Sequence, residues 1–263
     1  MPVILVTNDD GVHSPGIIAL YKALNPLGDV YMVAPEGEQS AVAHALTLHR
    51  PLKVEKIKLL NYSSDKKIFA INGTPTDCVI IGINKILRRK PDLIVSGINN
   101  GGNMGDDITY SGTVAAAIEG TLLGIPSIAV SLVKGIKDNG IYPDKPLRFQ
   151  KAAAIAKRLA SMVLKKTLPH DTLLNVNVPN TQNIKGIKLT RQGKRTYDNS
   201  VHEISDPRGK KHYWIGGGSP IWELGKDTDF VAVKNAFISV TPVHLDLTNY
   251  DALDFLRKTW KIN

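Results

Sequence analysis

Short apolar runs alternate with segments of helical apolar spacing along the first two thirds of the chain. Val3–Thr7 is an apolar run with β-branched residues, which predicts a buried strand. Ser14 and Pro15 form a cap and first position typical of a helix that continues to about Leu24. The same reasoning predicts strands at Asp29–Ala34, Ile68–Ile71, Asp92–Ser96, Pro126–Leu132 and Thr172–Val178, and helices from Thr74 to about Arg88, at Thr113–Leu123 and at Arg148–Leu164. This alternation predicts an α/β fold with a mostly parallel sheet and helices on both faces.

The pattern changes in the last third of the chain, where glycines, charges and short alternating stretches dominate. Strands are expected near Gly186–Thr190 and Phe237–Val240, and a helix at Asp251–Trp260. We therefore divide the chain into a core of residues 1–184 and a β-rich C-terminal extension of residues 185–263. The extension is expected to serve in assembly.

The chain carries an excess of positive charge. Lys and Arg total 33 and Asp and Glu total 24, so the formal net charge is +9. A basic surface can attract nucleic acid or phosphate esters, but a solvated surface is its commoner meaning. The basic residues are spread out, with local density only at Lys185–Arg195 and Arg208–Lys211 and no interleaved aromatic stripe. A nucleic-acid-binding protein is therefore not the first choice.

The single cysteine, Cys78, excludes an internal disulfide and a metal site built from several cysteines. It lies in an apolar stretch, which favours a buried structural residue over a nucleophile. The N-terminus lacks the basic and long apolar regions of a signal peptide. No apolar run approaches the ~18 residues that cross a bilayer. We expect a cytoplasmic protein with no membrane partner.

Two adjacent carboxylates follow the first predicted strand, in the turn Asn8-Asp9-Asp10-Gly11. Open α/β sheets bind ligands at the carboxyl ends of their strands, so this turn has the position of a ligand site. Neighbouring carboxylates repel each other unless a cation neutralises them, and a hard divalent ion does so with oxygen ligands. The alternative is an Asp-rich turn that only caps the next helix.

Two further loops follow predicted strands and are expected at the same edge of the sheet. In residues 35–40, Ser40 can offer a hydroxyl ligand or act as a local turn cap. In the Gly/Asn-rich residues 96–105, Asn99 can supply an amide oxygen to a metal, and Asn103 can donate its amide to a phosphate oxygen. Such loops are also common as simple turns.

A fourth segment, Tyr110-Ser111-Gly112-Thr113, precedes an Ala-rich predicted helix. Backbone N–H groups and two hydroxyls then meet at a helix N-terminus, a geometry that binds phosphate, although simple helix capping is the alternative. Together the four segments predict an oxygen-only metal site beside an anion-binding nest. Asp, Ser and Asn ligands favour Mg²⁺ or Mn²⁺ over Zn²⁺.

Several familiar motifs are absent from the sequence. There is no G-x-x-x-x-G-K-[ST] loop, no G-x-G-x-x-G after the first strand, no H-E-x-x-H and no G-x-S-x-G. Kinase, dehydrogenase, zinc-peptidase and esterase functions are therefore disfavoured. A metal-dependent phosphatase fits the four segments best.

Five stretches of the chain match one known family in order. They read ILVTNDDGVHSPG, VAPEGEQSAVAHALTL, INGTPTDCV, PDLIVSGINNGGNMGDDITYSGTVAAAIEG and FVAVKNAFISVTPVHLDLT. The chain therefore resembles the SurE family, the survival-protein 5′-nucleotidases. The stretches extend over nearly the whole chain, and their combination is highly specific.

The resemblance implies a Rossmann-like, three-layer core and a C-terminal extension that exchanges between the subunits of a homodimer or homotetramer. It implies hydrolysis of nucleoside 5′-monophosphates, with 3′-nucleotides and short polyphosphate as further candidates, and one Mg²⁺ or Mn²⁺ per subunit. Carried over by motif, Asp9 and Asp10 are the catalytic pair. The implied metal ligands are Asp9, Asp10, Ser40 and Asn99. The implied phosphate-binding residues are Asn103, Ser111, Gly112 and Thr113. Beside these, Asn8 is expected either to orient the acidic turn or to contact the phosphate.

The sequence leaves three points open. Asp10 is a metal ligand only, a general base or a covalent nucleophile. The same site also suits a regulatory module that holds a nucleotide without turnover. A nucleic-acid or polyphosphate binder driven by positive charge is a third function. Under the phosphatase hypothesis no stable nucleic-acid complex is expected.

Overall fold

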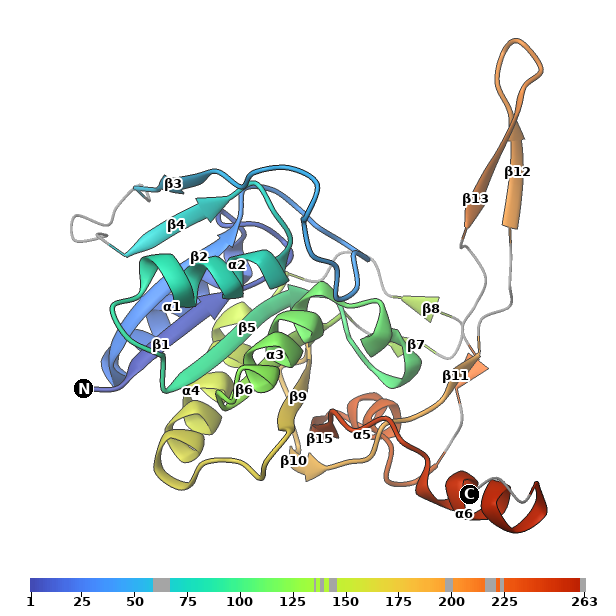
Figure 1. The fold of residues 1–263 in the computed structure, drawn as a ribbon. Helices are drawn as coiled ribbons and strands as arrows, with labels where there is room; N and C mark the ends of the chain where they lie inside the picture. The colour runs from blue at the N-terminus through green and yellow to red at the C-terminus, as the bar shows by residue number, and fades with distance from the viewer. Residues whose placement is uncertain are drawn as a thin grey trace.

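A central sheet organises the computed structural model, which describes residues 1–58, 67–134, 136–137, 140–141, 146–196, 201–215, 221–222 and 225–260. Its nine strands lie in the order β10-β15-β9-β6-β5-β1-β2-β4-β3 (Figure 1). Their bounds are β1 (Val3–Thr7), β2 (Asp29–Pro35), β3 (Val54–Lys56), β4 (Ile68–Ile71), β5 (Leu93–Asn100), β6 (Ser127–Val133), β9 (Thr172–Pro179), β10 (Gly186–Leu189) and β15 (Phe237–His244). Neighbours from β9 to β4 are parallel, whereas β15 runs antiparallel to β9 and β3 antiparallel to β4.

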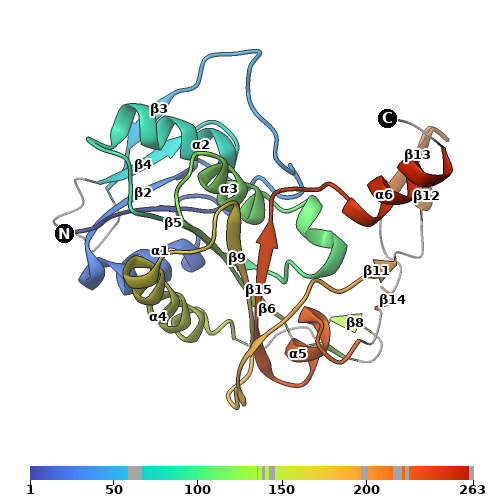
Figure 2. The same cartoon turned by 60° about the horizontal axis from the view of Figure 1, so that its bottom comes forward.

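Helices cover both faces of this sheet and complete three layers (Figure 2). The helices α1 (Pro15–Leu24) and α4 (Phe149–Lys166) pack on one face, and α2 (Pro75–Ile81) and α3 (Gly112–Leu122) pack on the other. Every residue of β1 is buried, because the two helical layers exclude water from both sides of the strand. The α/β fold class predicted from the alternating pattern is confirmed.

The helix that begins after Thr74 is shorter than its sequence predicts. Thr74 and Asp77 form a capping box with Pro75 at the first position, as the sequence signals indicate. The α-helix then ends at Ile81, and a π-helical turn, η2 (Gly82–Ile86), replaces the expected continuation. A strong start signal therefore set where this helix begins but not how far it continues.

The Gly/Asn-rich segment expected as one long loop, Gly97–Gly112, is partly regular. The strand β5 continues to Asn100, because β6 lies alongside and pairs with it beyond an irregularity between Gly97 and Asn99. A 3₁₀ helix, η3 (Gly105–Thr109), then leads into α3. Only the residues between these elements form the loop itself.

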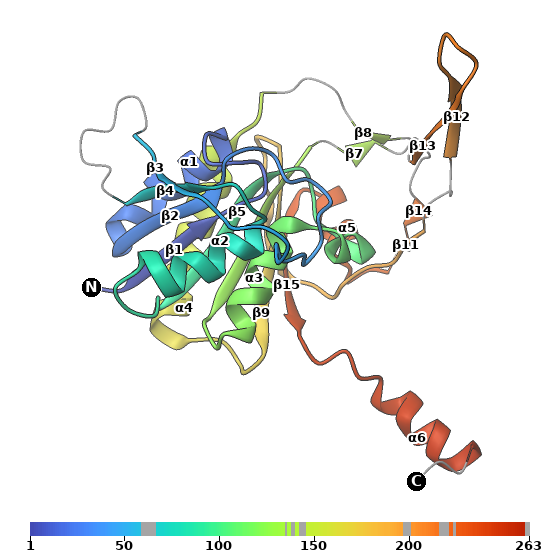
Figure 3. The same cartoon turned by 45° about the horizontal axis from the view of Figure 1, so that its top comes forward.

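The C-terminal part contributes both to the main sheet and to projecting elements. Since β10 and β15 are strands of the nine-stranded sheet, the sheet continues past residue 184, and the division into two domains stays a prediction. The hairpin of β12 (Val201–Ser205) and β13 (Lys211–Ile215) projects from the body, as does α6 (Tyr250–Thr259) (Figure 3). The remaining elements are η1 (Asn25–Leu27), β7 (Ile136–Lys137), β8 (Gly140–Ile141), β11 (Arg195–Thr196), β14 (Ile221–Trp222) and α5 (Asp229–Lys234).

Large apolar side chains are exposed on these projecting elements. Trp214 of β13 is 66% exposed and Phe255 of α6 is 59% exposed. Exposed apolar groups of this size on a protruding element are typical of an interaction surface, so a role in assembly stays our prediction. Among the helices of the described ranges, none has the length and apolar character that crossing a membrane requires.

Candidate active site

The turn Asn8-Asp9-Asp10-Gly11 connects β1 to α1 at the carboxyl end of β1. Asn8 is fully buried, and its Nδ2 donates to the Gly11 carbonyl oxygen at 3.0 Å and to Ser14 Oγ at 2.9 Å. These bonds fix the turn from inside. Since β1 pairs with both β2 and β5 in parallel, the ends of three strands meet beside the turn. The predicted position of this turn at a strand end is therefore confirmed.

Asp9 is held by the first turn of α3. Its carboxylate accepts hydrogen bonds from the backbone N–H of Thr113 at 3.0 Å and from the Thr113 hydroxyl. Only 6% of Asp9 is exposed. Burial raises the pKa of Asp9, and the bonds from Thr113 offset part of that rise. The hydroxyl that the sequence assigned to phosphate thus orients a carboxylate, and a phosphate contact of Thr113 stays a prediction.

Gly112 and Ser111 begin α3 next to Asp9. A Cβ on Gly112 would lie 2.9 Å from Asp9 Cβ, so only a glycine lets the helix approach the acid this closely. Ser111 Oγ accepts a hydrogen bond from the Val114 N–H at 3.1 Å, which confirms the capping alternative for this residue. A hydroxyl that accepts such a bond keeps its own proton for another acceptor. Phosphate binding by Ser111 and Gly112 stays a prediction.

Asp10 faces the end of β5. Its Oδ2 accepts a hydrogen bond from the Asn100 N–H at 3.0 Å. Burial, followed by the charge of Asp9, raises the pKa of Asp10 to about 6. The charge of Glu38 also raises the pKa of Asp10, and that of Lys134 lowers it. No role was assigned to Glu38 from the sequence, where its place two residues before Ser40 was the only signal.

Ser40 and Asn99 lie on the two segments that contact the acidic turn. The Gln39 N–H, next to Ser40, donates to the Asp9 carbonyl oxygen at 2.7 Å. Ser40 itself is exposed, and its hydroxyl donates to Glu38. Asn99 is half-buried, and its Nδ2 donates to the Gly101 carbonyl oxygen at 3.0 Å, which orients the amide. The structure thus brings both segments to the acids, while metal ligation by Ser40 and Asn99 stays a prediction.

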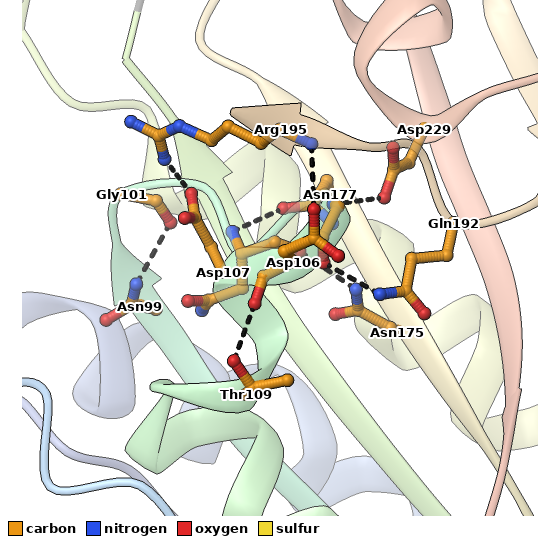
Figure 4. Close-up of polar contacts among 12 residues, drawn as sticks. Asn99, Gly101, Asp106, Asp107, Thr109, Asn175, Asn177, Gln192, Arg195 and Asp229 are labelled. Atoms are coloured by element: carbon orange, nitrogen blue, oxygen red, sulfur yellow. Dashed lines mark hydrogen bonds and ion pairs between the residues drawn. The ribbon is translucent and has the colours of Figure 1, made fainter. Parts of the chain in front are cut away.

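Asn103 is anchored in the protein interior. Its backbone N–H donates to Asn177 Oδ1 at 2.9 Å, and its carbonyl oxygen accepts from the side-chain amides of Asn175 and Asn177 at 2.9 and 2.8 Å (Figure 4). Its Nδ2 donates to Ser131 Oγ at 2.8 Å. The sequence predicted that the Asn103 amide donates to a phosphate oxygen. In the structure this amide donates to Ser131, and a phosphate contact of Asn103 stays a prediction. The residues Asn175, Asn177 and Ser131 on β9 and β6 were not singled out from the sequence.

The oxygen atoms at and around Asp9 and Asp10 suit a hard cation as ligands. Among the residues that the structure describes, no three His, Cys, Asp or Glu side chains form a metal-binding group. The candidate set is therefore two carboxylates completed by neutral oxygens, which favours Mg²⁺ or Mn²⁺ over a softer metal. Burial and like charge raise the pKa of both acids, and a divalent cation relieves that repulsion. In addition, Asn8 Oδ1 is buried with no hydrogen-bond partner among the described residues.

Comparison with known proteins identifies the family. The family model described as Survival protein SurE matches residues 4–199. The chain belongs to the SurE family. The 5′-nucleotidase SurE of Geobacter sulfurreducens is 53% identical over 262 residues, which cover 99% of this chain and 94% of that protein. The 5′-nucleotidase SurE of Geobacter metallireducens is 52% identical, with 98% and 96% covered. The crystal structure of the SurE protein from Aquifex aeolicus matches with a TM-score of 0.81 and 46% identity over 98% of this chain and 99% of that one.

Membership of the SurE family confirms the resemblance carried by the five sequence stretches. The similarity to a SurE crystal structure also confirms the mostly parallel, three-layer architecture. For the site, the structure shows direct contact between Asp9 and Thr113 and between Asp10 and Asn100. The assignment of individual residues to metal or phosphate in this SurE-family chain remains a prediction.

Proposed function

We propose that this SurE-family chain is a metal-dependent phosphatase that hydrolyses nucleoside 5′-monophosphates to nucleoside and phosphate. The observation that carries the proposal is the contact between the Asp9 carboxylate and the first turn of α3, which supports a cation site next to an anion site. Two relatives with 53% and 52% identity bear the name 5′-nucleotidase, which supports a nucleotide as the substrate. Nearly complete coverage of both chains supports the same activity in this one.

Four residues would hold one Mg²⁺ or Mn²⁺ per subunit. They are Asp9, Asp10, Ser40 and Asn99. When bound, the cation supplies positive charge to a phosphoryl oxygen and lowers the pKa of a bound water. Thr113 orients the carboxylate of Asp9, and the Asn100 N–H orients that of Asp10, so both acids are positioned by the protein itself.

The first turn of α3 would hold the phosphoryl group. The positive end of the helix dipole favours an anion at this end of an 11-residue helix, where the N–H groups of Thr113 and Val114 already donate to Asp9 and Ser111. The Ser111 hydroxyl would donate a hydrogen bond to a phosphoryl oxygen while its Oγ still accepts the bond that caps the helix. As negative charge grows on the phosphoryl oxygens, this hydroxyl and the helix dipole would stabilise it. The role of Asn8 would be to fix the acidic turn relative to α1 through its two hydrogen bonds.

Asp10 acts as a ligand in this proposal, and a covalent nucleophile is the alternative. A single-turnover reaction in ¹⁸O-labelled water detects a nucleophilic Asp10 whose acyl phosphate is opened by water at the carboxyl carbon. Direct attack by water puts the label into the released phosphate and leaves the enzyme unlabelled. Label that appears first in the Asp10 carboxyl group would refute direct attack and assign the nucleophile.

The proposed activity is tested with a panel of nucleoside 5′-monophosphates after removal of metal with EDTA. We expect phosphate release to stop in EDTA and to return when Mg²⁺ or Mn²⁺ is added. The same panel, extended to 3′-nucleotides and short polyphosphate, tests the wider substrate range that we propose. Nucleotide binding without phosphate release in any metal would refute the phosphatase and favour a regulatory module.

We also propose that the chain forms a homodimer or homotetramer through its C-terminal extension. The exposed side chains Tyr213 and Trp214 on β13 and Phe255 on α6 support this assembly. Light scattering at micromolar concentration should report two or four chains per particle. A monomer under these conditions would contradict the proposal.

A further inference from the structure

The helix η3 (Gly105–Thr109) lies between Asn103 and Ser111 along the chain. These two residues belong to the proposed phosphate-binding group, so the position of η3 determines how their segments stand relative to each other. At one end of η3, Asn103 is anchored by Asn177 on β9. At the other end, Ser111 begins α3. The middle of this connection is bonded to the C-terminal part of the chain.

Asp229 on α5 makes the central contact. Its Oδ2 accepts a hydrogen bond from the Gly105 N–H at 2.8 Å. Its Oδ1 accepts from the N–H groups of Gly193 at 3.0 Å and Phe230 at 2.7 Å. Asp229 is 0% exposed, and burial raises the pKa of its carboxyl group, while the oriented backbone donors offset part of that rise. One buried side chain thus joins η3, the segment before β11 and α5. Figure 4 shows Asp229 with its bond toward η3.

Gly105 docks on the C-terminal part through both of its backbone groups. Besides the N–H bond to Asp229, its carbonyl oxygen accepts from Gln192 Nε2 at 3.1 Å. A Cβ at this position would lie 3.1 Å from the Gly193 carbonyl oxygen, and φ is +55°. The close approach and the left-handed backbone both favour glycine here. The contact therefore depends on main-chain fit and is not an incidental touch between side chains.

Arg195 makes a second contact with the same helix. Its backbone N–H donates to Asp106 Oδ2 at 2.9 Å, and its guanidinium group pairs with the carboxylate of Asp107 (Figure 4). The guanidinium carbon lies 4.9 Å above the centre of the Trp222 ring, which stacks on Phe230 at 4.2 Å. Both acids of η3 thus contact Arg195 in the C-terminal part of the chain. The Trp222 ring, stacked on Phe230, stabilises the guanidinium group through a cation–π contact.

We infer that Asp229 is a positioning residue for phosphate recognition, acting through Gly105 on the η3 segment that connects Asn103 to Ser111. This inference rests on the proposed phosphatase function. Asp229 itself does not touch the reacting groups. Its carboxylate sets where η3 lies, and Arg195 secures the same helix through Asp107. The C-terminal part of the chain would therefore help to shape the phosphate site as well as to mediate assembly.

The variant Asp229→Asn tests the inference because it keeps the side-chain shape. If the amide oxygen retains the Gly193 and Phe230 bonds, its nitrogen faces the Gly105 N–H, and two donors then oppose each other. We expect KM for a nucleoside monophosphate, and the inhibition constant of inorganic phosphate, to rise about tenfold, which corresponds to one lost hydrogen bond. The loop meets phosphate in both bound substrate and transition state, so kcat should change by less than about threefold.

Mn²⁺ affinity without substrate provides the internal comparison. Thr113 and Asn100 position the two metal-site acids and neither contacts Asp229 in the described bonds, so calorimetry should show Mn²⁺ binding within about twofold of the wild type. The matched control is Asp227→Asn, which removes an exposed ion pair with Arg191 at 2.9 Å on the same part of the chain. Exposed pairs contribute little, so all parameters of the control should equal those of the wild type.

A second variant, Asp107→Asn, guards against failure of Asp229→Asn to fold. The Asp107 side chain is 14% exposed, and its loss should raise KM about threefold in the same direction. If the wild type is active and the folded variants keep the wild-type KM and phosphate inhibition, the inference is overturned and the proposed function stands. A parallel loss of kcat, Mn²⁺ affinity and thermal stability would overturn it too, since it shows a general structural role. Wild-type protein that releases no phosphate would instead refute the proposed function, and the inference with it.

Discussion

The hydroxyl of Thr113 allows a sharp test of how α3 serves the metal site. Thr113 is fully buried, and its hydroxyl donates to the carboxylate of Asp9, whose pKa is raised by burial. The variant Thr113→Val removes this donor and nearly preserves the side-chain shape, while the backbone N–H bond to Asp9 is kept. Asp9 should therefore become harder to ionise and less well oriented for a cation.

The size of the effect follows from the kind of bond that is lost. A hydrogen bond to a charged group contributes about 1.5–3 kcal/mol. For a chain of this size, about 2–4 °C of melting temperature corresponds to each kcal/mol, so we expect a decrease of about 3–12 °C. If the loss is expressed in metal binding as well, Mn²⁺ affinity should fall on the order of tenfold, since ~1.4 kcal/mol is a factor of ten.

Thermal melts in EDTA and calorimetric titration with Mn²⁺ measure the two effects separately. The control is Thr121→Val on the same helix, where a buried hydroxyl donates to the Ala117 carbonyl oxygen at 2.9 Å. This bond joins neutral groups, so the control should lose about 1 kcal/mol and bind Mn²⁺ normally. The reasoning is refuted if Thr113→Val binds Mn²⁺ as tightly as the control does.

Three further substitutions probe the same region. Asp10→Asn should fold but turn over nucleotide on the order of 10³-fold more slowly. In EDTA at pH 7 it should also be about 1 kcal/mol more stable, after discounting for exposure, because a pKa raised to about 6 marks an unfavourable charge. Because the pKa of Asp10 is raised from 3.8 to about 6 on folding, the wild type loses stability as pH rises through this range. Below about pH 4 Asp10 is protonated in both the folded and the unfolded state, so melts should show no advantage of Asp10→Asn there. Asn177→Ala removes both bonds to the Asn103 backbone and should destabilise the protein by about 2–5 kcal/mol in denaturant titrations, and an unchanged midpoint would contradict this. Gly112→Ala places a methyl group against Asp9 and should lower phosphate release at least about tenfold, whereas full activity would show that α3 can shift freely.

Local signals in the sequence predicted the elements well. The strand at Val3–Thr7 and the helix at Pro15–Leu24 have the bounds that the apolar pattern and the Ser14-Pro15 cap indicate. These features depend on residues close together in the chain, so a reader of the sequence has all the relevant information. The family, too, is carried by short contiguous stretches, and residues 4–199 match its model. Where the outcome depended on a neighbouring strand, as at the extended end of β5, local signals were insufficient.

The sequence by itself determined the α/β class, the family and the strand-end position of Asp9 and Asp10. Only the tertiary structure decided what surrounds those acids. The bond from Thr113 to Asp9 joins residues 104 apart, and that from Gly105 to Asp229 joins residues 124 apart. Which faces pack together, and how deeply each acid is buried, follow from the whole set of layers, because hydrogen bonds and desolvation act across space. The sequence alone therefore did not show that the hydroxyl of Thr113, which it assigned to phosphate, donates to the carboxylate of Asp9 in the folded chain.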